Sequence, residues 1–115
     1  MGRVLVVDDE PPVRNLVRLT LEMEGFEVET ASNGLEALDK IDLNEPSVVV
    51  LDLSMPGMDG GMVVDEMHDR GFKTPVIILS AYGALEAARE HHTEGALRKP
   101  FDPGELVDEV RRLAA

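Results

Sequence analysis

Three short, unbroken apolar runs stand out along the chain, at residues 4–7, 48–51 and 76–79. Each run is rich in valine or isoleucine and is followed directly by a polar residue. Strands of a parallel sheet have this pattern, because helices cover both faces of the sheet and bury every side chain. Two other segments differ: residues 26–30 alternate apolar and polar side chains, and residues 96–98 form only a short run. We therefore expect the three runs at the centre of one sheet and the other two segments at its edges.

The intervals between these strands carry apolar residues at helical spacing. In chain order the predicted apolar faces are Val13, Leu16, Val17 and Leu21; Leu35, Leu38 and Ile41; Val63 and Met67; Leu85 and Ala88; and Leu106, Val110 and Leu113. Five strand–helix units with short connections predict an α/β fold, a flavodoxin-like (βα)5 doubly wound parallel sheet with strand order 2-1-3-4-5. Since 115 residues suffice for one domain, we expect residues 1–115 to form a single domain.

Capping signals precede two of the predicted helices. Asn33 precedes the second helix with Glu36 three residues further on, and Asp102 precedes the last helix. Both arrangements satisfy free amide groups at a helix N-terminus. Asp8 and Asp9 could cap the first helix in the same way, and the pattern by itself leaves that alternative open.

Polar residues follow four of the predicted strands: Asp8 and Asp9 the first, Asp52 the third, Ser80 the fourth and Lys99 the fifth. In open α/β sheets, ligands bind beyond the carboxyl ends of the strands, near the point where the strand order reverses. Neighbouring strands lie about 5 Å apart, so we expect Asp8, Asp9 and Asp52 to lie within reach of a single ion.

Three carboxylates that lie this close repel one another, and a divalent cation removes the conflict. Magnesium fits because it takes oxygen ligands and accepts few carboxylates, whereas zinc prefers histidine or cysteine. Phosphoryl transfer depends mainly on positioning and on charge neutralisation, which a metal, a lysine and a hydroxyl donor can supply. The pattern thus predicts that Asp52 attacks as a carboxylate and becomes an acyl phosphate at a Mg²⁺ site.

Four motifs, in the same order and at nearly the same intervals, resemble the receiver domains of bacterial two-component response regulators. The motifs are Val4-Leu5-Val6-Val7-Asp8-Asp9-Glu10, Leu51-Asp52-Leu53-Ser54-Met55-Pro56-Gly57-Met58-Asp59-Gly60, Ile78-Leu79-Ser80-Ala81 and Lys99-Pro100-Phe101. The resemblance spans the whole chain. It implies a signalling switch that promotes its own aspartyl phosphorylation and dephosphorylation, and not an enzyme that turns over a separate substrate.

The resemblance implies how the phosphoacceptor and the metal are held. Asp52 is the expected phosphoacceptor and a metal ligand. Asp9 is expected to bind Mg²⁺ directly, and Asp8 to assist largely through water. The backbone carbonyl of Ser54 is expected to be a third protein ligand.

The resemblance also implies how the phosphoryl group is bound and where it comes from. Lys99 is expected to bind the phosphoryl oxygens, with a cis peptide bond to Pro100, and Ser80 to hydrogen-bond the phosphoryl group and shift toward it. The expected donor is a phosphohistidine on a sensor histidine kinase or a phosphotransfer protein, for which acetyl phosphate can substitute. The expected signal passes to an unidentified downstream protein.

The chain departs from the family between Gly95-Ala96 and Lys99. Family members usually carry three more residues there, of which the last is commonly Tyr or Phe. If the chain is aligned back from Lys99 without a gap, Ala96 takes the aromatic position, and with a gap or without one the aromatic is absent. That aromatic turns inward on activation in the family, so we expect this chain to signal through an altered face around its fourth helix and fifth strand. The only tyrosine, Tyr82, lies two residues after Ser80, where its bulk is expected to hinder the water that hydrolyses the acyl phosphate.

Composition excludes several other classes of function. The chain has 23 acidic and 11 basic residues and a net charge of −12, which argues against direct binding of nucleic acid or of anionic membranes. It has no cysteine, and therefore no disulfide or thiolate chemistry. Its N-terminus lacks the apolar stretch of a signal peptide, and no segment approaches the length of a membrane span. We expect a cytoplasmic protein.

Two other function classes deserve comparison. A phosphatase of the haloacid dehalogenase type has a second Asp two residues after its nucleophile, where this chain has Ser54. A receiver-like binding module that is independent of phosphate is the other alternative. Phosphate uptake at Asp52 distinguishes the phosphorylated receiver domain from such a module. His91 and His92 invite a metal or phosphotransfer role, but we expect a solvated pair near a helix C-terminus.

Overall fold

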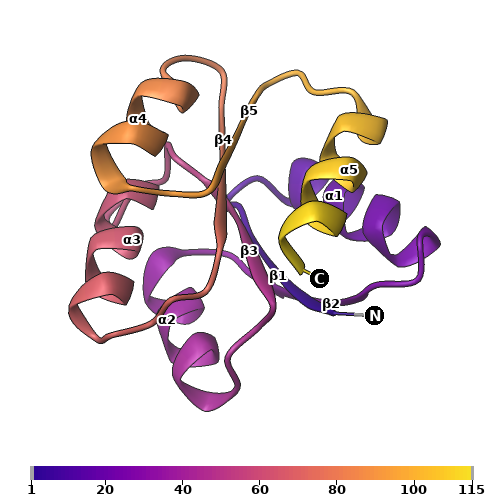
Figure 1. Ribbon diagram of the computed structural model, residues 1–115. Coiled ribbons are helices and arrows are strands. Elements are labelled where there is room, and N and C mark those ends of the chain that lie inside the picture. Colours follow the sequence, from indigo (N-terminus) through magenta and orange to yellow (C-terminus); the bar gives the residue numbers. More distant parts are fainter. Residues whose placement is uncertain (1, 115) are drawn as a thin grey trace.

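The computed structural model describes residues 2–114 as a five-stranded parallel sheet with helices on both faces (Figure 1). In chain order the elements are β1 (Arg3–Val7), α1 (Pro11–Met23), β2 (Glu27–Ala31), α2 (Gly34–Leu43), β3 (Val48–Asp52), α3 (Gly60–Asp69), β4 (Val76–Ser80), α4 (Ala84–His91), β5 (Gly95–Arg98) and α5 (Pro103–Ala114). The strand order is β2-β1-β3-β4-β5, and each pair is parallel. The predicted flavodoxin-like (βα)5 fold is therefore confirmed. Within residues 2–114, none of the helices combines the length and the apolar character needed to cross a bilayer.

Two apolar cores lie on opposite faces of the sheet. Alternate residues of β3 show this division: Val48 and Val50 belong to the core under α1 and α5, whereas Val49 and Leu51 belong to the core under α2, α3 and α4. Figure 1 shows the same two groups of helices on either side of the strands. β3 and β4 are buried throughout and β1 nearly so, whereas Glu27 of β2 is exposed. Central and edge strands thus lie where the apolar pattern predicted them, and burial of the central runs is the main source of stability.

Three leucines that helical spacing assigned to apolar faces are exposed instead. Leu16 in α1, Leu35 in α2 and Leu85 in α4 have relative exposures of 54%, 65% and 60%. The prediction was wrong for these residues because the sheet covers only one stripe of each helix, and spacing alone does not fix the width of that stripe. α4 buries three alanines in place of the larger residue, so its Leu85 faces solvent.

Side chains cap α2 and α5 as predicted. Asn33 Oδ1 accepts a hydrogen bond of 2.8 Å from an amide in the first turn of α2, and Asp102 Oδ1 accepts one of 3.0 Å at the start of α5. α1 differs, because its N-cap residue is Glu10 and no side-chain cap is formed. Asp8 and Asp9 therefore do not cap α1, and the capping alternative for them is wrong.

The two adjacent histidines lie in different environments. His91 Nδ1 lies 2.8 Å from Asp65 Oδ1, and the His91 side chain is only 19% exposed. This contact joins α4 to α3 and needs Gly61, since a Cβ at that position would lie 2.6 Å from His91 Nε2. His92 is exposed and ends α4 in the left-handed conformation, with φ 58°. The expectation of a solvated pair is thus wrong for His91, and both residues lie outside the site at the strand ends.

Candidate functional site

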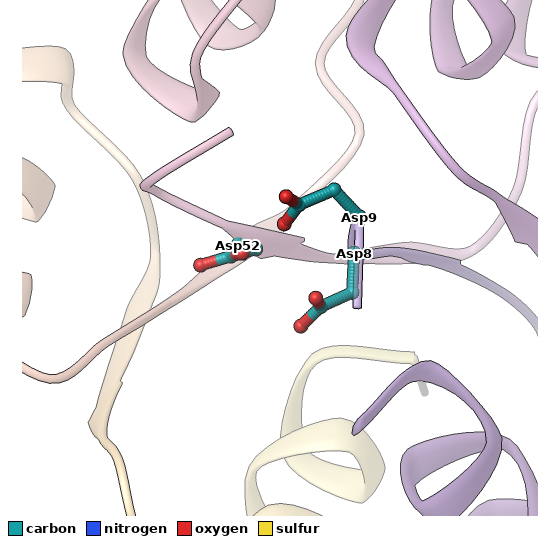
Figure 2. A group of neighbouring side chains, drawn as sticks. All are labelled: Asp8, Asp9 and Asp52. Atoms are coloured by element: carbon teal, nitrogen blue, oxygen red, sulfur yellow. The ribbon is translucent and has the colours of Figure 1, made fainter. Parts of the chain in front are cut away.

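Three carboxylates meet at the carboxyl end of the sheet (Figure 2). Asp8 and Asp9 follow β1, Asp52 ends β3, and the register of these neighbouring strands pairs Val7 with Leu51. One carboxylate oxygen from each aspartate lies within 4.8 Å of the other two. Asp8 is 0% exposed and Asp52 is 4% exposed, whereas Asp9 is partly exposed. The structure therefore brings together the three acids that the sequence singled out.

Lys99 places a positive charge beside these acids. Its Nζ lies 3.2 Å from Asp8 Oδ2 and 3.3 Å from Asp52 Oδ1. The Lys99 amide donates to the Ser80 carbonyl at 2.9 Å, which fixes the lysine at the end of β5, and its peptide bond to Pro100 is cis, as predicted. One ammonium group lies beside a group of three carboxylates, so the site has fewer positive than negative groups.

Burial and a neighbouring carboxylate change the protonation of Asp52. Burial, and then the charge of Asp8, raises the pKa of Asp52 to about 6, although Lys99 and the Ser54 amide act to lower it. Burial disfavours the charged form of Lys99, but the Asp8 and Asp52 carboxylates outweigh it and raise the pKa of that ammonium. A proton on Asp52 removes one negative charge from the cluster, and a bound cation would offset the charge of the ionised carboxylates.

The raised pKa of Asp52 predicts how stability depends on pH in metal-free buffer. Asp52 has a pKa of about 6 in the folded protein, against 3.8 for an unperturbed Asp carboxyl. Between these values the folded state binds more protons than the unfolded state. The contribution of Asp52 to the free energy of unfolding is therefore complete below about pH 4 and is lost as the pH rises through about 6.

The variant Asp52→Asn keeps this position neutral at every pH and isolates the effect. With a chelator present, urea unfolding should find the variant more stable than the wild type near pH 7.5, by on the order of 1–3 kcal/mol. The two proteins should be about equally stable near pH 4, where Asp52 is protonated. A stability difference that is the same at both pH values would contradict the prediction.

The donor set fits a magnesium ion. The candidate ligand group consists of three aspartates, so each ligand atom is a carboxylate oxygen, which Mg²⁺ prefers. Ser54 lies beside the group, because its amide donates to Asp52 Oδ1 at 3.3 Å. The use of the Ser54 carbonyl as a further ligand stays a prediction.

Ser80 lies at the end of β4 and is 4% exposed. Its Oγ donates to the Tyr82 carbonyl at 2.5 Å and accepts from the Tyr82 amide at 3.2 Å. The register pairs Asp52 with Leu79, so Ser80 is the next residue along the neighbouring strand. The structure thus places Ser80 near the acids, with its hydroxyl bonded to the turn that leads into α4.

Sequence reasoning missed two residues that shape the site. Arg14 of α1 donates from Nη1 to the Asp8 carbonyl at 2.8 Å and so holds the turn after β1. Gly60 begins α3, and its amide donates to the Leu53 carbonyl at 2.9 Å. Gly60 stands within a motif noted above and could have been found there, whereas no pattern in the sequence connects Arg14 to Asp8.

Comparison with known proteins identifies the family. The family model of the response regulator receiver domain matches residues 4–111. Sporulation initiation phosphotransferase F of Bacillus subtilis is 38% identical over 113 residues, which cover 96% of this chain and 91% of that protein. Regulatory protein AtoC of Escherichia coli is 40% identical over 115 residues, which cover 97% of this chain and 25% of that protein. This chain belongs to the receiver domain family of response regulators.

Solved structures agree with this assignment. Chemotaxis protein CheY4 of Vibrio cholerae is similar with a TM-score of 0.88 and 34% identity, covering 98% of both chains. A Francisella response regulator receiver domain reaches a TM-score of 0.93 at 32% identity, covering 99% of this chain and 97% of that one. The chain spans only 44% of the mycobacterial regulator TrcR, as it spans a quarter of AtoC. Receiver domains bind Mg²⁺ at an acidic pocket, and Asp8, Asp9 and Asp52 form an acidic group in this chain.

Proposed function

We propose that residues 1–115 form a single receiver domain that accepts a phosphoryl group on Asp52 in a two-component or phosphorelay system. The donor is a phosphohistidine of a sensor histidine kinase or phosphotransfer protein. The observation that carries the proposal is the position of Asp52: a nearly buried carboxylate, grouped with Asp8 and Asp9 and 3.3 Å from Lys99 Nζ. Buried charges are normally paired or bound to a metal, and acids with perturbed pKa values gather at functional sites.

The residues of the chain hold Mg²⁺ and prepare Asp52 for attack. Asp8, Asp9, Asp52 and the Ser54 carbonyl would hold the ion, which supplies the positive charge that the cluster lacks. With Lys99 beside it, Asp52 has a pKa of about 6 and is mostly ionised at neutral pH, and a bound cation would favour the ionised form further. An Asp52 oxygen then forms a bond to phosphorus as the bond from phosphorus to the donor imidazole nitrogen breaks.

Lys99 and Ser80 act on the phosphoryl group itself. The Lys99 ammonium already spans Asp8 and Asp52, so it can pair with phosphoryl oxygens on the latter without leaving the site. Ser80 offers a hydroxyl donor from the adjacent strand. Attack by water on the acyl phosphate releases inorganic phosphate and regenerates the Asp52 carboxylate, so the domain returns to its unphosphorylated state and turns over no separate substrate.

Phosphorylation would change protein–protein contacts. The net charge of −12 opposes binding of nucleic acid or an anionic membrane by this domain, so its partners are the kinase or phosphotransfer protein and a downstream protein. We place these events in the cytoplasm. Ala96 in β5 leaves the face between α4 and β5 without the family's aromatic, and the signal would pass through that altered face.

Intact-mass measurement with Mg²⁺ and acetyl phosphate tests the proposal. The wild type should gain one phosphoryl group, and the gain should need Mg²⁺. Asp52→Asn should gain none, whereas Asp69→Asn, at an exposed position of α3, should behave as the wild type. If phosphohistidine donors also fail to label the wild type, the chain is the phosphate-independent binding module instead.

A further inference from the structure

We propose that Arg14 is a positioning residue that sets the affinity of the acidic site for Mg²⁺, because it orients the backbone from which the Asp9 side chain extends. The inference rests on the proposed function, in which Asp9 binds the ion directly. Arg14 lies in α1 and its cationic side chain cannot be a metal ligand itself. Its effect on the ion therefore passes through the turn after β1.

Asp9 is the least constrained of the three acids. Its carboxylate takes part in no hydrogen bond or ion pair within residues 2–114, and the residue is partly exposed. Figure 2 shows its side chain leaving the end of β1 beside Asp8 and turning toward Asp52. The direction of this carboxylate therefore depends on the backbone that precedes it.

Arg14 holds that part of the backbone. Its Nη1 donates to the Asp8 carbonyl at 2.8 Å, and this carbonyl belongs to the peptide unit that joins Asp8 to Asp9. Because a peptide unit is planar, a hydrogen bond to its oxygen restrains the whole unit against rotation. The Asp8 carboxylate is held separately, by the Glu10 amide at 2.9 Å and by Lys99 Nζ at 3.2 Å. Arg14 thus restrains the side of the turn that leads into Asp9.

The first residues of α1 cannot supply this donor from their backbone. A helix N-terminus usually offers free amide hydrogens to the loop before it. Here Pro11 and Pro12 begin the helix without an amide hydrogen, and the N-cap residue forms no side-chain cap. The turn after β1 is therefore held from further along α1, by the guanidinium group of Arg14.

The charge of Arg14, taken alone, would act on Mg²⁺ in the opposite direction. Arg14 forms no ion pair within residues 2–114, so no carboxylate neutralises its charge beside the acidic turn. A positive group near the site repels a cation, and its removal would by itself tighten Mg²⁺ binding. Loss of a residue that orients a metal ligand weakens binding instead, typically by about tenfold or more. The sign of the change thus separates positioning from charge.

Calorimetric titration with Mg²⁺, without any phosphoryl donor, tests the inference. Arg14→Met should bind Mg²⁺ about tenfold or more weakly than the wild type. Arg14→Lys keeps the charge and one donor group, so its affinity should lie between the two, and it carries the test if Arg14→Met does not fold. Arg18→Met is the matched control, because Arg18 lies one turn further along α1 and pairs with Glu22, and it should bind like the wild type. Wild-type or tighter binding by both Arg14 variants would overturn the inference.

The Mg²⁺ dependence of phosphoryl uptake from acetyl phosphate gives a second readout. In Arg14→Met the Mg²⁺ concentration at half-maximal rate should rise about tenfold or more. The maximal rate should change much less, because a saturating ion itself holds Asp9 in place. A lower maximal rate with an unchanged half-maximal concentration would show a merely structural role and would overturn the inference alone. Absence of Mg²⁺ binding by the wild type would overturn the proposed metal site, and this inference with it.

Discussion

Gly60→Ala is expected to destabilise the protein by about 2–3 kcal/mol and to slow phosphoryl uptake at Asp52 about tenfold or more. A Cβ on Gly60 would lie 2.6 Å from the Asp52 carbonyl oxygen and 2.9 Å from Leu53 Cα. Both contacts are with backbone atoms, so no side chain can rotate away to make room. Either α3 or the end of β3 must move, and β3 is the strand that positions the Asp52 carboxylate.

Urea unfolding and the rate of phosphorylation by acetyl phosphate measure the two effects. Gly104→Ala is the matched control, since that glycine also lies in the first turn of a helix and its added Cβ would meet only the Asp102 side chain, at 3.5 Å. The control should match the wild type, or gain about 0.5–1 kcal/mol because alanine favours helix. Gly60→Ala with wild-type stability would show that the close approach of α3 to β3 is relaxed in solution.

The central strands could be predicted because burial on both faces leaves an unbroken apolar run. Val76 to Leu79 form such a run, and the structure buries all of β4. The grouping of Asp8 with Asp52 followed from the same reasoning, since parallel strands end at one edge of the sheet. These inferences need only local pattern and the geometry of a parallel sheet.

Contacts between distant side chains could not be predicted in this way. His91 meets Asp65 across 26 residues, and only the close packing of α3 on α4 at Gly61 makes that contact. The helical pattern of α4 likewise did not reveal that small alanines face the sheet and Leu85 faces solvent. Which stripe of a helix is buried depends on its neighbours in space, and a single sequence does not specify those neighbours.

Lys99→Met is expected to destabilise the metal-free protein at about pH 8 by about 2–4 kcal/mol and, with Mg²⁺ present, to slow phosphoryl uptake at least about tenfold. Lys99 is the ion-pair partner of both Asp8 and Asp52, and it is only 19% exposed. Removing it leaves two buried carboxylates without their neighbouring cation. The loss of stability should be smaller at about pH 5, because Asp52, whose pKa is already about 6 with Lys99 in place, is then mostly protonated.

Magnesium separates the two roles of Lys99. Added Mg²⁺ should restore most of the stability of Lys99→Met, because the ion neutralises the same carboxylates. Phosphoryl uptake, which needs Mg²⁺, should still be at least about tenfold slower in the variant than in the wild type at saturating Mg²⁺, because the ammonium that pairs with the phosphoryl oxygens is missing. Lys73→Met, at an exposed position, should leave both quantities unchanged and controls for the loss of one positive charge. A wild-type rate of uptake in Lys99→Met at saturating Mg²⁺ would mean that Lys99 only balances the aspartates and takes no part in binding the phosphoryl group.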